Sequence, residues 1–121
     1  FAHTSREKKD IKFFDPRALQ DYLHCIKDPK TVSSICEDYR AASTIDLNDD
    51  RISRNKQVKL KMPLLVLWGN KGKIDQWYKP LSIWQDYCLQ KVKGNAIESG
   101  HYLAEENPKN LIKNIEYFFN F

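Results

Sequence analysis

The chain has few cysteines and no long apolar run, and each of these scarcities excludes a class of protein. Cys25, Cys36 and Cys88 are odd in number and lack zinc-finger spacing, so the sequence predicts neither a disulfide framework nor a metal site. We therefore expect a reducing, cytoplasmic environment. The longest unbroken apolar run, residues 64–68, is far shorter than the roughly 20 residues that a membrane span needs. No segment resembles a signal peptide.

A strong excess of charge of one sign is also missing. Twenty basic residues are offset by 16 acidic ones, and the lysines are scattered, so nucleic-acid binding is disfavoured. The 41% hydrophobic and 30% charged composition is typical of a soluble globular protein, and 121 residues can bury one modest core. The only methionine is Met62, so we expect that Phe1 is not the natural start and that the chain was cut, processed or trimmed.

The first half of the chain has helical periodicity. After a polar tail that reaches about Lys12, Asp15-Pro16 predicts a helix start, because the carboxylate can accept hydrogen bonds from free N–H groups. Asp28-Pro29 repeats this signal and opens a second helix that extends as far as Ile45. A short polar third helix is expected after Asn48. These helices form a predicted block from about 14 to 57.

The second half alternates between strand and helix patterns. Residues 63–69 are continuously apolar and end in glycine, which predicts a parallel strand covered on both faces. A loop and a helix from Pro80 follow, then a second strand at 92–98 and a last helix that Asn107-Pro108 begins. We expect Trp84 and the Phe118–Phe119 pair to lie in the core.

Two parallel strands do not make a complete sheet. They leave two open edges of backbone donors and acceptors, and parallel pairs are rarely found outside larger, covered sheets. The sequence therefore predicts an α/β fold with an incomplete sheet. It divides into a helical segment, 1–57, and an α/β segment, 58–121.

Residues 36–41, 63–69 and 98–101 together resemble the C-terminal part of haloacetate dehalogenases, which are α/β-hydrolases related to soluble epoxide hydrolases. Residues 14–18 resemble the start of a cap-domain helix in that family. The resemblance implies that the helical segment is the end of a cap domain. The α/β segment would then be the last two strands and last two helices of the hydrolase core.

The resemblance also implies a chemistry. In this family an aspartate attacks the carbon that bears the halide, and a histidine then activates water to hydrolyse the ester. His101 matches that histidine, whereas the nucleophile would lie upstream, so we expect the chain alone to be inactive. No cofactor or metal is implied. Many α/β-hydrolases place the acid that orients the histidine where Gly72 stands; in this family it lies upstream, and Asp75 is a substitute in the chain. Thr44 aligns near a halide-binding tyrosine, which argues against fluoroacetate as substrate.

The residues themselves leave alternatives open. His101 follows a strand end and precedes a proline-capped helix, which suits a general base, because histidine exchanges protons near neutral pH. The alternative is a plain surface histidine on a loop. His3 and His24 have no partners at metal-ligand spacing, and we expect them to be a tail residue and a helix residue.

Tyr39 could line a substrate cleft under the cap, or could equally be a tyrosine that packs its helix. Trp77, Tyr78 and Tyr102 are expected on loops at the mouth of the site, where they could form an aromatic wall for a small apolar substrate or simply pack cap against core.

Three functional hypotheses follow. The chain could be one half of a split or trimmed hydrolase that regains activity with the upstream half. It could be a remnant of gene decay that folds or self-associates without catalysis. It could also be a small α/β module that binds a protein or ligand through exposed helices. The partner we expect is the upstream half or a second copy of the chain.

Overall fold

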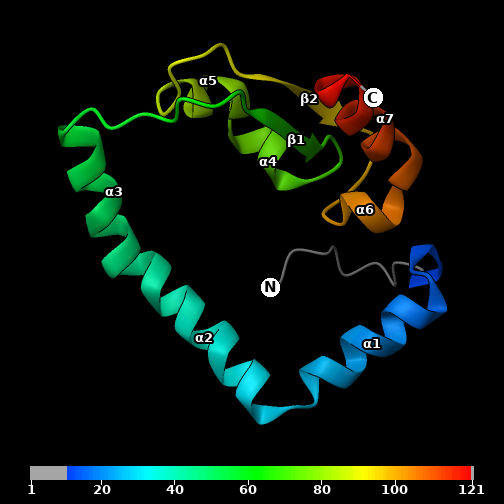
Figure 1. The fold of residues 1–121 in the computed structure, drawn as a ribbon. Helices are drawn as coiled ribbons and strands as arrows, with labels where there is room; N and C mark the ends of the chain where they lie inside the picture. Colours follow the sequence, from blue (N-terminus) through cyan, green and yellow to red (C-terminus); the bar gives the residue numbers. More distant parts are fainter. Residues whose placement is uncertain (1–10, 121) are drawn as a thin grey trace.

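A computed structural model describes residues 11–120, and His3 lies outside this range. Seven α-helices, one 3-10 turn and two strands are found there (Figure 1). In chain order they are η1 (Ile11–Phe13), α1 (Pro16–Ile26), α2 (Pro29–Ser43), α3 (Ile45–Asn55), β1 (Leu65–Gly69), α4 (Lys73–Trp77), α5 (Pro80–Gln85), β2 (Lys93–Ile97), α6 (Leu103–Glu106) and α7 (Pro108–Phe119).

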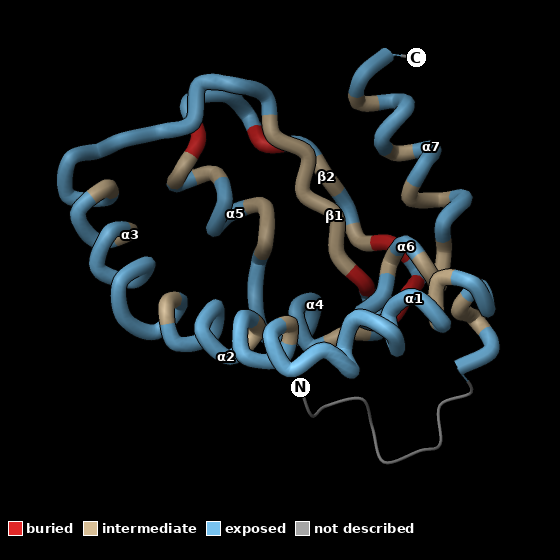
Figure 2. The backbone as a smooth tube through the Cα atoms, turned by 60° about the horizontal axis from the view of Figure 1, so that its bottom comes forward, coloured by how far each residue is buried: buried red, intermediate tan, exposed pale blue. Residues whose placement is uncertain are grey.

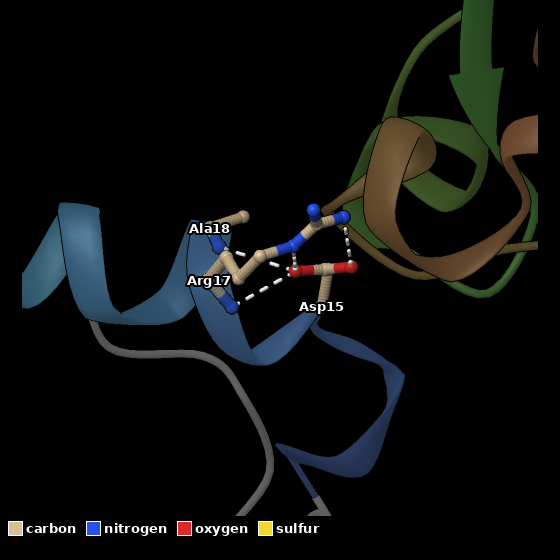
Figure 3. Close-up of polar contacts among 3 residues, drawn as sticks. All are labelled: Asp15, Arg17 and Ala18. Atoms are coloured by element: carbon tan, nitrogen blue, oxygen red, sulfur yellow. Dashed lines mark hydrogen bonds and ion pairs between the residues drawn. The ribbon is translucent and has the colours of Figure 1, made fainter.

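Helices α1 and α2 begin at the two predicted Asp-Pro signals. The Asp15 carboxylate accepts hydrogen bonds from the N–H groups of Arg17, at 2.8 Å, and Ala18, at 3.4 Å (Figure 3). Asp28 caps α2 in the same way, by accepting from the N–H of Lys30 at 2.9 Å. Both prolines occupy the first helical turn, where no N–H is needed.

The expected start of the third helix was wrong. Helix α3 begins at Ile45, before Asn48, and α2 ends at Ser43. Thr44 separates the two helices, because its backbone is non-helical (φ −129°, ψ −89°) and its hydroxyl donates to the carbonyl of Arg40 at 2.7 Å. The break is thus a single residue.

Helices α1 to α3 form an open arc in Figure 1. The arc starts beside α6 and returns to the α/β part ahead of β1. No residue of these three helices is buried, and Figure 2 shows them largely as exposed. The described part of the helical block therefore has no core of its own.

Strands β1 and β2 pair in parallel, as predicted, with Leu65 opposite Lys93 and Gly69 opposite Ile97. Within residues 11–120 the sheet has these two strands alone, which confirms an incomplete sheet. The buried residues lie at and around the strand ends (Figure 2), and they are Gly69, Cys88, Val92, Ile97, Ser99 and Gly100.

Several residues expected in the core are exposed instead. Trp84 on α5 is 43% exposed and Phe119 on α7 is 59% exposed, while Phe118 is half-buried. The full covering expected for β1 is also wrong, because four of its five residues are only half-buried. A sheet of two strands has too little surface to bury the apolar sides of both α5 and α7. These two helices, in turn, do not fully cover its two faces.

Two short helices replace predicted loops. Helix α4 follows β1, so Trp77 is the last residue of a helix rather than a loop residue. Tyr102 immediately precedes the four-residue helix α6. No helix in residues 11–120 has the length and hydropathy needed to span a membrane.

Candidate active site

His101 lies on a short loop that connects the carboxyl end of β2 to α6. It is exposed, and the ring of Tyr102 meets its imidazole edge-on with centroids 5.2 Å apart. This is the position predicted from the sequence. In parallel α/β sheets, ligands bind beyond the carboxyl ends of the strands, so the imidazole stands where such a site is expected.

The loops after the two strands are joined by backbone hydrogen bonds. The N–H of Asn70 donates to the carbonyl of Ile97 at 2.9 Å, and the N–H of Lys71 donates to the carbonyl of Ser99 at 3.0 Å. Gly69 permits this approach, since a Cβ there would lie 1.8 Å from the carbonyl oxygen of Gly100. The His101 loop is thereby fixed to the end of β1.

A carboxylate that sequence reasoning missed supports the same loop. Glu106, on α6, accepts a hydrogen bond from the N–H of Gly100 at 2.5 Å and another from the N–H of Tyr102 at 3.1 Å. Both are bonds to an ionisable acceptor, the stronger kind in proteins. The available signal was a glutamate five residues after His101, ahead of Asn107-Pro108.

Asp75, the sequence-based substitute for the orienting acid, has a different contact. Its Oδ1 accepts a hydrogen bond from the indole N–H of Trp68 at 2.6 Å, which ties α4 to β1. Gly72, where many α/β-hydrolases carry that acid, immediately precedes α4 and has no side chain. Asp75 therefore has a structural contact, and nothing in its geometry favours it as the partner of His101.

Tyr102 contacts the start of the helical block. Its ring centroid lies 5.3 Å from that of Phe14 and 6.2 Å from that of Phe13, and Phe14 in turn meets the ring of Tyr22. The Tyr22 hydroxyl donates to the Glu105 carboxylate at 2.9 Å, and this bond raises the pKa of the phenol. These contacts favour the packing alternative for Tyr102, since they hold α1 to α6.

The other two predicted substrate-binding residues lie on other elements. Tyr39 is on α2 and is 59% exposed; Trp77 ends α4, is 61% exposed, and has the Lys73 ammonium 5.8 Å from its ring centre. Arg40, beside Tyr39, pairs with Glu37 on the same helix, which lowers the pKa of that carboxyl. Of the predicted aromatic residues, the structure brings Tyr102 next to His101.

Residues 11–120 contain no group of three or more histidine, cysteine, aspartate or glutamate side chains placed to hold a metal ion. An open depression of about 180 Å³ lies between α4 and α5, with an apolar and aromatic lining: Ile74, Tyr78, Pro80, Ile83 and Trp84. His101 is not part of its lining.

Comparison with known proteins gives a consistent picture. No family model matches the chain. A fluoroacetate dehalogenase from Burkholderia sp is 27% identical over 107 residues, which cover 88% of this chain and 34% of that protein. The chain thus spans about a third of the length of this curated relative.

Solved structures agree in fold and in coverage. One is a provisionally described α/β-hydrolase from Nostoc sp PCC 7120. It is 40% identical, with a TM-score of 0.85, and the match covers 92% of this chain and 37% of that one. A provisionally described acyltransferase from Salmonella enterica is 36% identical with a TM-score of 0.83, over 93% and 36%. An epoxide hydrolase from Pseudomonas aeruginosa, also provisionally described, is 32% identical with a TM-score of 0.80, over 89% and 36%.

These likenesses confirm the fold class and the resemblance inferred from the sequence. The parallel strand pair, the helices and the partial coverage of each relative agree with one another. The chain has the fold of the C-terminal portion of an α/β-hydrolase, and it resembles the haloacetate dehalogenases and soluble epoxide hydrolases within that group.

Proposed function

We propose that this chain supplies the histidine base of an α/β-hydrolase that cleaves a carbon–halogen or epoxide carbon–oxygen bond through an ester intermediate. The observation that carries the proposal is the position of His101. It is exposed on a loop at the carboxyl end of β2, and backbone hydrogen bonds fix that loop to the end of β1. A hydrolase places reacting groups at this edge of its sheet.

The step assigned to His101 is the hydrolysis of the ester. The imidazole accepts a proton from a water molecule while the water oxygen attacks the ester carbonyl. The carbonyl–oxygen bond to the alcohol then breaks, which releases the hydroxylated product and regenerates the carboxylate nucleophile. A histidine near neutral pH can accept such a proton and return it in the same cycle.

The nucleophile would come from another segment of polypeptide. The turn after β1 runs through Asn70, Lys71 and Gly72, and none of these is an aspartate, serine or cysteine. A histidine without a nucleophile in hydrogen-bonding reach performs no nucleophilic catalysis. We infer that the partner is the upstream part of such a hydrolase, which would also supply the neighbouring strands and the small-molecule site.

A chimera tests this proposal. This chain would replace the matching third of the Burkholderia fluoroacetate dehalogenase, and turnover would be measured as fluoride release from fluoroacetate and diol formation from styrene oxide. We expect turnover of at least one substrate, and a loss of about 100-fold or more in His101→Ala, the usual contribution of a general base. Mass spectrometry should then detect the trapped ester.

His24→Ala is the matched control, because His24 is an exposed histidine on α1. It should leave turnover unchanged. An active chimera whose turnover His101→Ala leaves unchanged would contradict the proposal. A chimera without turnover would also contradict it and would favour an inactive remnant or an interaction module. Steady turnover by the chain alone would contradict the assignment of the nucleophile to a separate segment.

A further inference from the structure

We propose that Glu106 is the positioning residue of His101, an inference that rests on the proposed function. Its carboxylate accepts hydrogen bonds from the two backbone N–H groups on either side of the histidine. One oxygen, Oε2, accepts from Gly100 at 2.5 Å, and the other, Oε1, accepts from Tyr102 at 3.1 Å. Each carboxylate oxygen therefore holds one flank of His101.

This arrangement restricts the backbone from which the imidazole projects. An exposed loop is otherwise mobile, and a base must be held within a few tenths of an ångström of the atom it serves. Asn107 adds a second restraint, since its side-chain amide donates to the carbonyl of Glu98 at 3.1 Å. The loop is thus fastened to the start of α7 as well as to Glu106.

Because Gly100 has no side chain, the Glu106 carboxylate can approach its backbone. A Cβ at position 100 would lie 2.8 Å from Oε1 of Glu106 and 3.0 Å from Oε2, which is closer than such atoms normally approach. A side chain there would displace the glutamate from the amides. Gly100 and Glu106 therefore form one unit.

The neighbouring glutamate does not share this role. Both glutamates are half-buried, but Glu105 accepts a hydrogen bond from the Tyr22 hydroxyl on α1, whereas Glu106 accepts from the two amides of the loop. Two consecutive carboxylates thus serve different parts of the molecule. The assignment to Glu106 rests on its own contacts and not on a general excess of acidic residues near the loop.

The first test measures amide hydrogen exchange by NMR on the full chain. Glu106→Ala removes both acceptors, so exchange at Gly100 and Tyr102 should rise by about tenfold or more. Glu106→Gln keeps a single acceptor oxygen, because its NH₂ group cannot accept, and it should give an intermediate rise. Glu116→Gln on α7 makes the same chemical change away from the loop and should change neither amide.

Unchanged exchange at both amides in Glu106→Ala would overturn the inference and leave the proposed function standing.

The second test uses the chimera. A positioning role predicts that Glu106→Ala lowers kcat by about tenfold or more with little change in KM, and that Glu106→Gln recovers part of the loss. Equal kcat in Glu106→Ala and the parent chimera would also overturn it. Failure of His101→Ala to lower turnover would instead count against the proposed function.

Discussion

At the scale of single residues, Gly69 does more for the candidate site than its small size suggests. It ends β1, is buried, and lies opposite Ile97 in the parallel pair. A Cβ would meet the carbonyl oxygens of both Gly100 and Ser99, at 1.8 and 2.6 Å. Only a residue without a side chain allows the two strand ends to approach this closely.

Gly69→Ala should therefore destabilise the fold and displace the His101 loop. The obstructing atoms are backbone, which cannot rotate away, so we expect a loss of about 1–3 kcal/mol in the free energy of unfolding. Chemical denaturation measures this loss, and the amide shifts of Ser99 and Gly100 report the displacement. Gly72→Ala is the control and should have a smaller effect, because its nearest contact would be at 3.3 Å. Equal effects would contradict the role of Gly69.

Three residues near the candidate site show which of its features can be predicted from the sequence. The position of His101 was predictable because a strand end, a glycine and a capped helix surround it in consecutive sequence. Its role as a base stays a prediction. Glu106 was not, since a carboxylate that binds backbone amides has no motif of its own. The role proposed for Asp75 depended on where its carboxylate points, and the bond from Trp68 is visible in three dimensions alone.

At the scale of elements, the cap of α1 makes a prediction about pH. The Arg17 guanidinium, followed by the N–H groups of Arg17 and Ala18, lowers the pKa of Asp15 below its ordinary value of 3.8. The ionised cap is therefore favoured in the folded chain. Its contribution is complete above pH 3.8 and is lost as the pH falls through the lowered pKa.

NMR Cα shifts of residues 16–26 should accordingly indicate intact helix at pH 6 and fraying of the first turn as the pH falls below 3.8. Asp15→Ala should show that fraying at every pH, because no carboxylate remains to accept from the free N–H groups. Asp21→Ala, within the same helix, should keep the wild-type pH dependence. A first turn that does not respond to Asp15→Ala would refute the capping role.

Element lengths explain which helices were predictable. The starts of α1, α2 and α7 were correct, because each is long enough to show an apolar period and opens with Asp-Pro or Asn-Pro. Helices α4 and α6, with five and four residues, are too short for a period to be visible. The start of α3 was misjudged because the break at Thr44 is a single residue.

At the scale of the whole molecule, the described chain leaves much apolar surface uncovered. Trp77, Tyr78 and Trp84 are all more than two-fifths exposed around α4 and α5. Both strands also have an outer edge without a strand partner in residues 11–120. Large apolar patches and unpaired strand edges promote association.

The isolated chain should therefore self-associate as its concentration rises, which sedimentation velocity at several concentrations can measure. Trp84→Ser should weaken the association, because Trp84 lines the depression between α4 and α5. Tyr117→Ser, at a residue 83% exposed on α7 and outside that depression, should have less effect. A chain that stays monomeric at every concentration would contradict this expectation.

The incompleteness of the sheet was itself predictable, since a continuously apolar parallel strand needs neighbours that the rest of the sequence does not provide. The core residues were not. Trp84 and Phe119 have the composition and spacing of buried positions, and sequence periodicity reports which face is apolar without reporting what covers it.

The adjacent glutamates of α6 have a mechanical consequence. Glu105 accepts a hydrogen bond from the Tyr22 hydroxyl on α1, and Glu106 accepts hydrogen bonds from the N–H groups of Gly100 and Tyr102. Both carboxylates lie on the same four-residue helix, α6. The contact between α1 and α6 and the restraint on the His101 loop therefore depend on one short element.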